Sequence, residues 1–184
     1  EKATILGGLK LVVDEFILCT VHRDSNTDLP ENMEQIFSAL LSIGENSGLK
    51  IVLPLHPRTK SKMKEQLSEE LYASIEESEM ILVIPPAGFL DIIALEKNAR
   101  MLITDSGGLQ KESYFFKKPC IILRPQTEWV EIVENGNAIL TAADEDKIID
   151  AFNTLIIKGD YSFPNFYGDG KAAEFICSKL IEQI

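Results

Sequence analysis

The side chains best suited to chemistry lie in short turns, each of which follows an apolar run. His22 and Arg23 follow the first run, His56 and Arg58 follow the second, and Arg124 follows the fifth. Imidazoles move protons near neutral pH, and guanidinium groups bind phosphate oxygens in pairs. Both histidines of the chain and three of its arginines fall in such turns. This placement indicates a site for an anionic substrate.

A further turn, Asp105-Ser106-Gly107-Gly108, stands between an apolar run and a helical pattern. Two adjacent glycines weaken local structure, because each loses much conformational freedom on folding. Glycines also let a phosphate approach the backbone, and the free amides at a helix start favour negative charge. Ser106 would add a hydroxyl donor. The alternative is a tight strand-to-helix turn that binds nothing.

Two more side chains extend this candidate anion site. Glu112, within the first turns of the following helix, can accept the paired hydroxyls of a ribose, as the acidic residue of dinucleotide folds does. Alternatively, it only favours the start of that helix. Phe89 follows Pro-Pro-Ala-Gly and is either an aromatic platform for a base or a core residue of its own helix. Of these two, we expect the core position.

Structural explanations also exist for the histidine turns. His22 and Arg23 could form a half-buried polar pair satisfied by nearby carbonyls, and Thr59 could cap the helix that follows His56. Two histidines on different strands and no cysteine cluster do not make a metal-ligand set, so we expect neither a metal nor a cofactor. A hydrolase built on Ser106 is disfavoured because the sequence GxSxG is absent.

The elements that must position these residues alternate between short apolar runs and longer segments of helical period. This alternation is typical of a parallel sheet covered by helices on both faces. We predict one α/β domain with a Rossmann-like, doubly wound parallel sheet, whose ligands bind at the carboxyl ends of the strands. The predicted strands are Phe16–Val21, Lys50–Leu55, Met80–Ile84, Arg100–Thr104, Pro119–Leu123 and Ala138–Leu140. The predicted helices are Pro30–Asn46, Thr59–Leu67, Glu69–Glu77, Gly88–Asn98, Leu109–Phe116, Glu128–Glu134, Asp144–Ile157 and Gly170–Gln183.

The amino-acid composition argues against two classes of binding partner. Lysine and arginine number 18 against 29 acidic residues, a net charge of -11, so we expect no nucleic acid and no membrane surface as partner. Charges at Lys10, Asp14 and Glu15 interrupt the apolar start, which argues against a membrane span or a secretory signal. Three widely spaced cysteines without CxxC indicate reduced, buried thiols in a cytoplasmic protein. Because the chain opens without methionine, we expect a piece of a longer protein.

Five segments taken together resemble the non-hydrolysing UDP-N-acetylglucosamine 2-epimerases. They are TVHRDSN from Thr20, HPRT from His56, TDSGGLQKES from Thr104, LRPQTEWVE from Leu123 and FYGDGKAAE from Phe166. Their order and spacing agree with the family, but they cover only the C-terminal half of its enzyme. That enzyme folds as two Rossmann-like domains facing each other across a cleft, the GT-B arrangement. The resemblance therefore implies that residues 1–184 are a UDP-binding C-terminal domain without its N-terminal partner, and that the full-length protein is a homodimer.

The resemblance also implies roles for individual residues. His22 is similar to the family's catalytic histidine near the diphosphate and sugar, Glu112 to its ribose-binding glutamate, and Phe89 lies where the family lines the uracil. The diphosphate-binding turn is Ser106, Gly107 and Gly108. The remaining residues expected to bind UDP or substrate are Arg23, His56, Arg58, Arg124, Thr127 and Glu128.

The implied activity is elimination of UDP across C1 and C2 of the sugar, then re-addition with C2 inverted. The acid and base carboxylates of the family lie in the other half, so we expect this chain alone to be inactive. Trp129 replaces a family arginine, and Arg23-Asp24-Ser25-Asn26 departs from R-x-E-N. These departures leave open a modified substrate such as UDP-2,3-diacetamido-glucuronic acid. A GT-B glycosyltransferase donor domain and a non-catalytic UDP-binding module also remain open.

The last helix carries apolar residues at helical spacing and, by analogy with related two-domain folds, should pack partly against the other domain. We therefore expect the apolar face of this helix to be exposed in the present chain.

Overall fold

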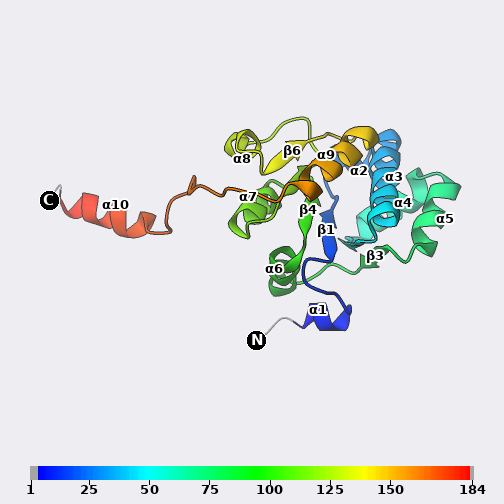
Figure 1. The fold of residues 1–184 in the computed structure, drawn as a ribbon, viewed down its shortest axis with the longest axis horizontal. Helices are drawn as coiled ribbons and strands as arrows, with labels where there is room; N and C mark the ends of the chain where they lie inside the picture. The colour runs from blue at the N-terminus through cyan, green and yellow to red at the C-terminus, as the bar shows by residue number, and fades with distance from the viewer. Residues whose placement is uncertain (1–3, 183–184) are drawn as a thin grey trace.

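A computed structural model describes residues 4–182 and shows a six-stranded, all-parallel sheet between helices (Figure 1). The strand order is β3-β2-β1-β4-β5-β6, the order of a Rossmann fold. The predicted fold class is thus confirmed. The strands are β1 (Phe16–Thr20), β2 (Lys50–Pro54), β3 (Ile81–Ile84), β4 (Met101–Thr104), β5 (Cys120–Ile122) and β6 (Ala138–Leu140).

The helices follow the predicted ranges, with shifts of one or two residues at several ends. They are α1 (Ile5–Gly8), α2 (Asp24–Thr27), α3 (Pro30–Ser47), α4 (Pro57–Gln66), α5 (Glu69–Glu77), α6 (Phe89–Asn98), α7 (Gly107–Phe115), α8 (Val130–Glu134), α9 (Glu145–Ile157) and α10 (Ala172–Ile181). The short helices α1 and α2 were not predicted. Helix α7 begins at Gly107 rather than at the predicted Leu109, so the two glycines form its first turn.

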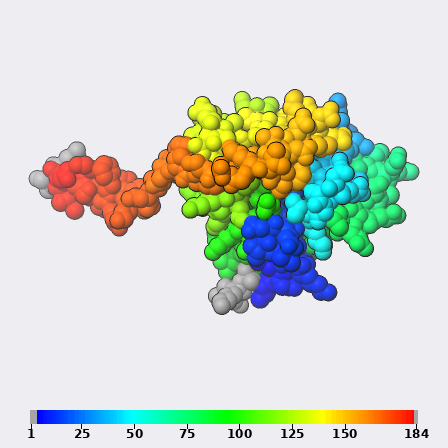
Figure 2. Space-filling view, in the orientation of Figure 1, coloured from blue at the N-terminus to red at the C-terminus, as the bar shows by residue number. Residues whose placement is uncertain are grey.

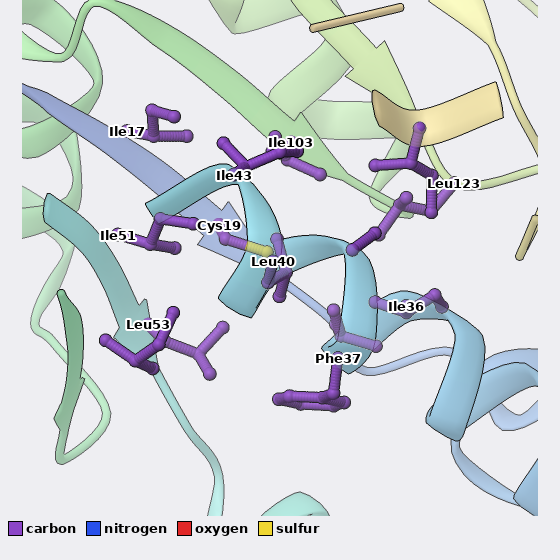
Figure 3. Close-up of a cluster of buried hydrophobic side chains, with 14 of the residues drawn as sticks. Ile17, Cys19, Ile36, Phe37, Leu40, Ile43, Ile51, Leu53, Ile103 and Leu123 are labelled. Atoms are coloured by element: carbon purple, nitrogen blue, oxygen red, sulfur yellow. The ribbon is translucent and has the colours of Figure 1, made fainter. Parts of the chain in front are cut away.

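Alternate residues of the strands serve two separate cores, because successive side chains point to opposite faces of a sheet. On one face Ile17, Cys19, Ile51 and Leu53 pack under α3, whose Phe37 and neighbours cover them (Figure 3). Helix α9 packs beside α3 on the same face. Helix α3 turns its apolar stripe toward the sheet and ends at Gly48 in the left-handed conformation.

The opposite face is covered by α1, α6, α7 and α8, whose apolar residues meet Phe16, Leu18 and Leu102. The extended segment after α9 closes this side, since the Tyr114 hydroxyl donates a 2.5 Å hydrogen bond to the carbonyl of Pro164. With both faces buried, the sheet leaves only its strand ends available for a polar site.

Helix α10 lies apart from the sheet, at the end of that extended segment (Figures 1 and 2). None of its residues is buried, and Phe175, Ile176, Leu180 and Ile181 are each more than half exposed. The expected exposure of this apolar face is confirmed; Gln183 of the predicted helix falls outside the described residues. Cys177 on α10 is exposed, so the expectation of three buried thiols is wrong for this one, whereas Cys19 and Cys120 are buried. Within residues 4–182, no helix has both the length and the apolarity to cross a membrane.

Two phenylalanines with opposite environments give a test of this packing. Phe37 is 1% exposed in the core and Phe175 is 63% exposed on α10. Phe37→Ala should lower the free energy of unfolding by about 3–5 kcal/mol, because it leaves a cavity. Phe175→Ala should change it by less than about 0.5 kcal/mol. Urea unfolding measures both, and equal losses would contradict the separation of α10 from the core.

Candidate functional site

The candidate site lies at the carboxyl ends of β1 and β4, where the strand order reverses. These strands are neighbours, with Thr20 opposite Thr104 and their hydroxyl oxygens 2.6 Å apart. The Thr104 hydroxyl also accepts the Ser106 amide at 3.0 Å. The turn after β1 is thereby brought beside the turn after β4, although 83 residues separate His22 from Asp105.

Asp105 is the centre of this edge. Its side chain is fully buried, and its Oδ2 accepts hydrogen bonds from the amides of His22 and Arg23 at 3.0 and 2.9 Å. The Asn26 Nδ2 donates to the same oxygen at 3.1 Å and also to the carbonyl of Leu123 at 3.0 Å. His22 Nδ1 lies 2.9 Å from Asp105 Oδ1. One carboxylate therefore holds the whole turn after β1.

The contact between His22 and Asp105 shifts their two pKa values in opposite directions. Burial alone would raise the pKa of Asp105, but the hydrogen bonds from the His22 side chain and from the Arg23 and His22 amides lower it overall. The hydrogen bond to Asp105 in turn raises the pKa of His22, against the opposing effect of partial burial. His22 is therefore held with its ring oriented by Nδ1, its Nε2 edge half exposed, and its charged form favoured.

The two glycines of the next turn are not required by the fold. Neither Gly107 nor Gly108 has a positive φ. A Cβ on Gly107 would come no nearer than 3.5 Å to any atom, and one on Gly108 no nearer than 3.7 Å, which are ordinary contacts. Ser106 caps α7 by accepting the Leu109 amide at 3.5 Å. No acceptor within residues 4–182 is bonded to the amides of Gly107 and Gly108, which remain available to a ligand.

The segment after β5 flanks these amides. Arg124 donates two hydrogen bonds to Glu128, at 2.9 and 2.7 Å, and this contact lowers the pKa of Glu128 to about 2. The Thr127 hydroxyl donates to Gln110 at 2.6 Å. Trp129 donates its indole N–H to the carbonyl of Gly107 at 2.7 Å. The predicted residues Arg124, Thr127 and Glu128 are thus beside the glycine turn, but Arg124 is already paired.

The turn after β2 has a different cap from the predicted one. His56 caps α4, with its Nδ1 accepting the Arg58 amide at 3.3 Å. The proposed cap Thr59 is wrong, because Thr59 is a buried residue inside the helix. Arg58 is paired with Asp24 and Asp28 at 2.8 and 3.1 Å, which ties this turn to the one after β1.

Phe89 corrects a second expectation. It is the first residue of α6 and is 73% exposed, so the expected core position is wrong. Its position at the first turn of the helix places it ahead of the residues that reach the core. At the neighbouring strand ends, an apolar hollow of about 340 Å³ lies between Leu55, Val83 and Pro85. Phe89 and this hollow belong to the same edge of the sheet as the glycine turn.

Glu112 lies on α7, after the glycine turn, and is half-buried.

Sequence reasoning missed Asp105 and Asn26 as site residues, although they orient His22 and Arg23. The signal available for Asp105 was an ionisable residue placed directly after the most buried strand. Nothing in the sequence distinguished Asn26, whose role depends on the contact with Asp105 and Leu123.

Asp105→Asn tests the centre of the site. An asparagine side chain has one acceptor and one donor group, so it cannot serve all the donors that face Asp105. We expect the free energy of unfolding to fall by about 3 kcal/mol or more, measured by urea unfolding at pH 7. The pKa of His22 should fall toward its ordinary value, measured by NMR titration with His56 as the internal reference. An unchanged His22 titration would contradict the pairing.

The sign of the pH dependence follows from the two shifts. The contribution of His22 to stability is full below 6.5 and is lost as the pH rises through its raised pKa. That of Asp105 is full above 3.8 and is lost as the pH falls through its lowered pKa. The difference in free energy of unfolding between wild type and Asp105→Asn should therefore be largest between pH 3.8 and pH 6.5.

Comparison with known proteins identifies the family. The family model of the UDP-N-acetylglucosamine 2-epimerases matches residues 3–181. A UDP-N-acetylglucosamine 2-epimerase homolog of Methanococcus maripaludis is 42% identical over 179 residues, which cover 96% of this chain and 47% of that protein. The UDP-2,3-diacetamido-2,3-dideoxy-D-glucuronate 2-epimerase of Pseudomonas aeruginosa is 41% identical over 167 residues, 91% of this chain and 44% of that protein.

Among solved structures, the UDP-GlcNAc 2-epimerase from Methanocaldococcus jannaschii matches with a TM-score of 0.86 and 34% identity, over 98% of this chain and 49% of that chain. Its complex with UDP-GlcNAc and UDP matches with a TM-score of 0.84. The chain spans about half the length of the curated relatives it matches. Since the family model covers nearly all of the sequence and the fold agrees, this chain belongs to the UDP-N-acetylglucosamine 2-epimerase family.

Proposed function

We propose that this chain is the C-terminal, nucleotide-binding half of a UDP-sugar 2-epimerase and holds the UDP leaving group of the reaction. The observation that carries this proposal is the glycine pair at the start of α7. Glycine lowers helix stability relative to alanine by up to about 1 kcal/mol per residue. Neither the backbone conformation nor the space around Gly107 and Gly108 requires it. A ligand that must touch both amides supplies the missing reason.

The charges around the turn suit a diphosphate. His22, with its pKa raised by Asp105, presents a half-exposed imidazolium edge, and the terminal nitrogens of Arg23 make no hydrogen bond to any described residue. Arg124 is neutralised by Glu128, so the anion would be held mainly by His22, Arg23 and the amides of Gly107 and Gly108. Such donors stabilise the charge that develops on the diphosphate as its bond to C1 breaks.

The nucleoside would extend away from this turn. Glu112 would accept the two ribose hydroxyls. The base would lie toward Phe89 and the apolar hollow beside Leu55, because an exposed aromatic ring and an apolar wall both favour stacking of a flat base. His56 and Arg58 belong to the same edge and complete the substrate-binding set.

The reaction proposed for the whole protein converts UDP-N-acetylglucosamine and UDP-N-acetylmannosamine into each other. A base removes the C2 proton, the C1–O bond breaks with its electron pair leaving on UDP, and a C1=C2 double bond forms. UDP then adds back at C1 while C2 regains a proton on its other face. The proton-transfer carboxylates would come from the N-terminal half, so this chain alone should not epimerise.

A modified UDP-sugar is a second candidate substrate. The Pseudomonas aeruginosa relative acts on a diacetamido-glucuronate nucleotide and is 41% identical. In this chain Trp129 replaces the arginine of the family motif and donates to the carbonyl of Gly107, so the side chain next to the proposed diphosphate is neutral rather than charged. Assaying the full-length protein with both nucleotide sugars decides between them.

The exposed apolar face of α10 would return across the cleft onto the N-terminal half. A homodimeric, cytoplasmic enzyme that supplies polysaccharide biosynthesis is the setting we propose for the full-length protein. Both proposals rest on family resemblance and on the exposure of Phe175 and its neighbours.

Gly108→Ala separates ligand binding from folding. The added methyl group makes only an ordinary contact, 3.7 Å from the Ser106 hydroxyl oxygen, so the free energy of unfolding should stay the same or rise by up to about 1 kcal/mol. Binding of UDP and of pyrophosphate should both weaken roughly tenfold, because the methyl group blocks the amides. Calorimetric titration measures these affinities. Gly7→Ala, in open space on α1, is the matched control and should leave both affinities unchanged. Wild-type pyrophosphate affinity in Gly108→Ala would argue against the proposed diphosphate turn.

Glu112→Gln separates the nucleoside from the diphosphate. A hydrogen bond to a charged group contributes about 1.5–3 kcal/mol, so UDP affinity should fall roughly tenfold or more. Pyrophosphate does not reach Glu112 and should bind as before. If the variant binds UDP as tightly as the parent, Glu112 is not part of the site.

A further inference from the structure

Glu96 is a buried acid without an ordinary partner. It lies on α6 and is 0% exposed, and no donor among the described residues bonds to either of its carboxyl oxygens. An ionised carboxylate left unpaired in the core costs several kcal/mol. The same group costs much less when it carries a proton and donates it to an acceptor. Glu96 therefore requires an acceptor close by.

Glu112 on the adjoining helix α7 is that acceptor. Helices α6 and α7 pack together, and Glu112 is the α7 residue whose charge and hydrogen bond raise the pKa of the Glu96 carboxyl group. Two carboxylates offer only acceptors, so this bond exists only when one of the two groups is protonated. If both groups were ionised, neither oxygen of Glu96 would have a donor.

The surrounding charges leave the proton on Glu96. Burial, then the charge and the hydrogen bond of Glu112, raise the pKa of Glu96 to about 8. Helix α1, packed against α6, carries no charged residue. The other charged group of α7 is Lys111, whose ammonium lies 4.4 Å from the ring centroids of both Trp129 and Tyr167.

Further charged groups near α6 lie in its own sequence, directly after it at Arg100, and in the segment before β1. On α6 they are Asp91 and Lys97. In the segment before β1, which bonds to the carbonyl of Asn98, they are Lys10, Asp14 and Glu15. Among these groups, Glu112 is the one whose charge raises the pKa of Glu96.

We propose that Glu96, as a neutral acid, is a positioning residue that holds the carboxylate of Glu112 in place to accept the ribose hydroxyls of the nucleotide. The bond occupies one acceptor direction of Glu112 and fixes its orientation, so the rest of the carboxylate faces the ligand without rotamer freedom to lose. This inference rests on the proposed UDP site, and it adds a requirement for one proton behind that site.

Two substitutions that keep a side chain of similar size separate the effect of the Glu96 proton from that of the side-chain volume. Glu96→Gln keeps a neutral donor, and Glu96→Met keeps only an apolar chain. At pH 7, Glu96→Gln should bind UDP within about twofold of the parent, whereas Glu96→Met should bind it roughly tenfold more weakly. Pyrophosphate, which would contact the turn at Ser106–Gly108 and the donors of His22 and Arg23 but not Glu112, should bind all three proteins equally. A purely structural role of Glu96 would affect both ligands alike.

The pH profile provides the second readout. As the pH rises from 7 to 9, Glu96 loses its proton, the two carboxylates repel, and the UDP affinity of the parent should fall by up to roughly tenfold. Glu96→Gln cannot lose a proton and serves as the control, since its ratio to the parent cancels titration of the ligand itself. This comparison decides the question even if Glu96→Met fails to fold.

Two results would overturn the inference while leaving the UDP site intact: equal UDP binding by Glu96→Met and the parent, or a parent-to-Gln ratio that stays constant from pH 7 to 9. Failure of the parent to bind UDP at all would overturn the proposed function and this inference together.

Discussion

The buried carboxylate of Asp105 is the constraint on which the rest of the site depends. A fully buried charge is unfavourable unless donors surround it, and here every donor comes from the turn after β1: two backbone amides, the Asn26 amide group and the His22 ring. Satisfying one carboxylate therefore fixes the path of a segment 79 to 83 residues away in sequence. Asp105 also immediately precedes Ser106 and the free amides of α7. Its carboxylate therefore fixes the position of the His22 ring relative to those amides.

A strongly acidic chain can still bind an anion, because the potential at this edge is local. Most of its cations are already neutralised: Arg58 by Asp24 and Asp28, and Arg124 by Glu128. What remains is the outer part of Arg23 and backbone dipoles that carry no net charge, because the His22 ring is itself paired with Asp105. The site would therefore attract an anion mainly through hydrogen-bond donors, and Asp105 supports this by raising the pKa of His22.

The sheet was predictable because each strand is a continuous apolar run and each long helix has a periodic apolar stripe. The turns that carry the site residues were predictable for the same reason, since parallel strands end at one edge. Details set by distant contacts were not predictable. Asp105 and Asn26 depend on the adjacency of β1 and β4, and the cap at His56 replaced the more usual threonine. Phe89 was assigned to the core from its apolar character, but its position at the first turn of α6 leaves it outside. Glu96 gave no signal at all within an apolar helical pattern.

Helix α7 stands between two buried acids whose environments drive them to opposite states. Asp105, at its start, receives several donors and stays ionised; Glu96, beside its later turn, receives none and stays protonated. In the proposed site, the first state raises the pKa of His22 beside the diphosphate, and the second lets Glu96 hold Glu112 beside the ribose. A nucleoside diphosphate has the matching order of groups, acceptors at the phosphates and donors at the ribose hydroxyls. In the site we propose, the two carboxyl groups would therefore set both the place and the direction of such a ligand along the helix.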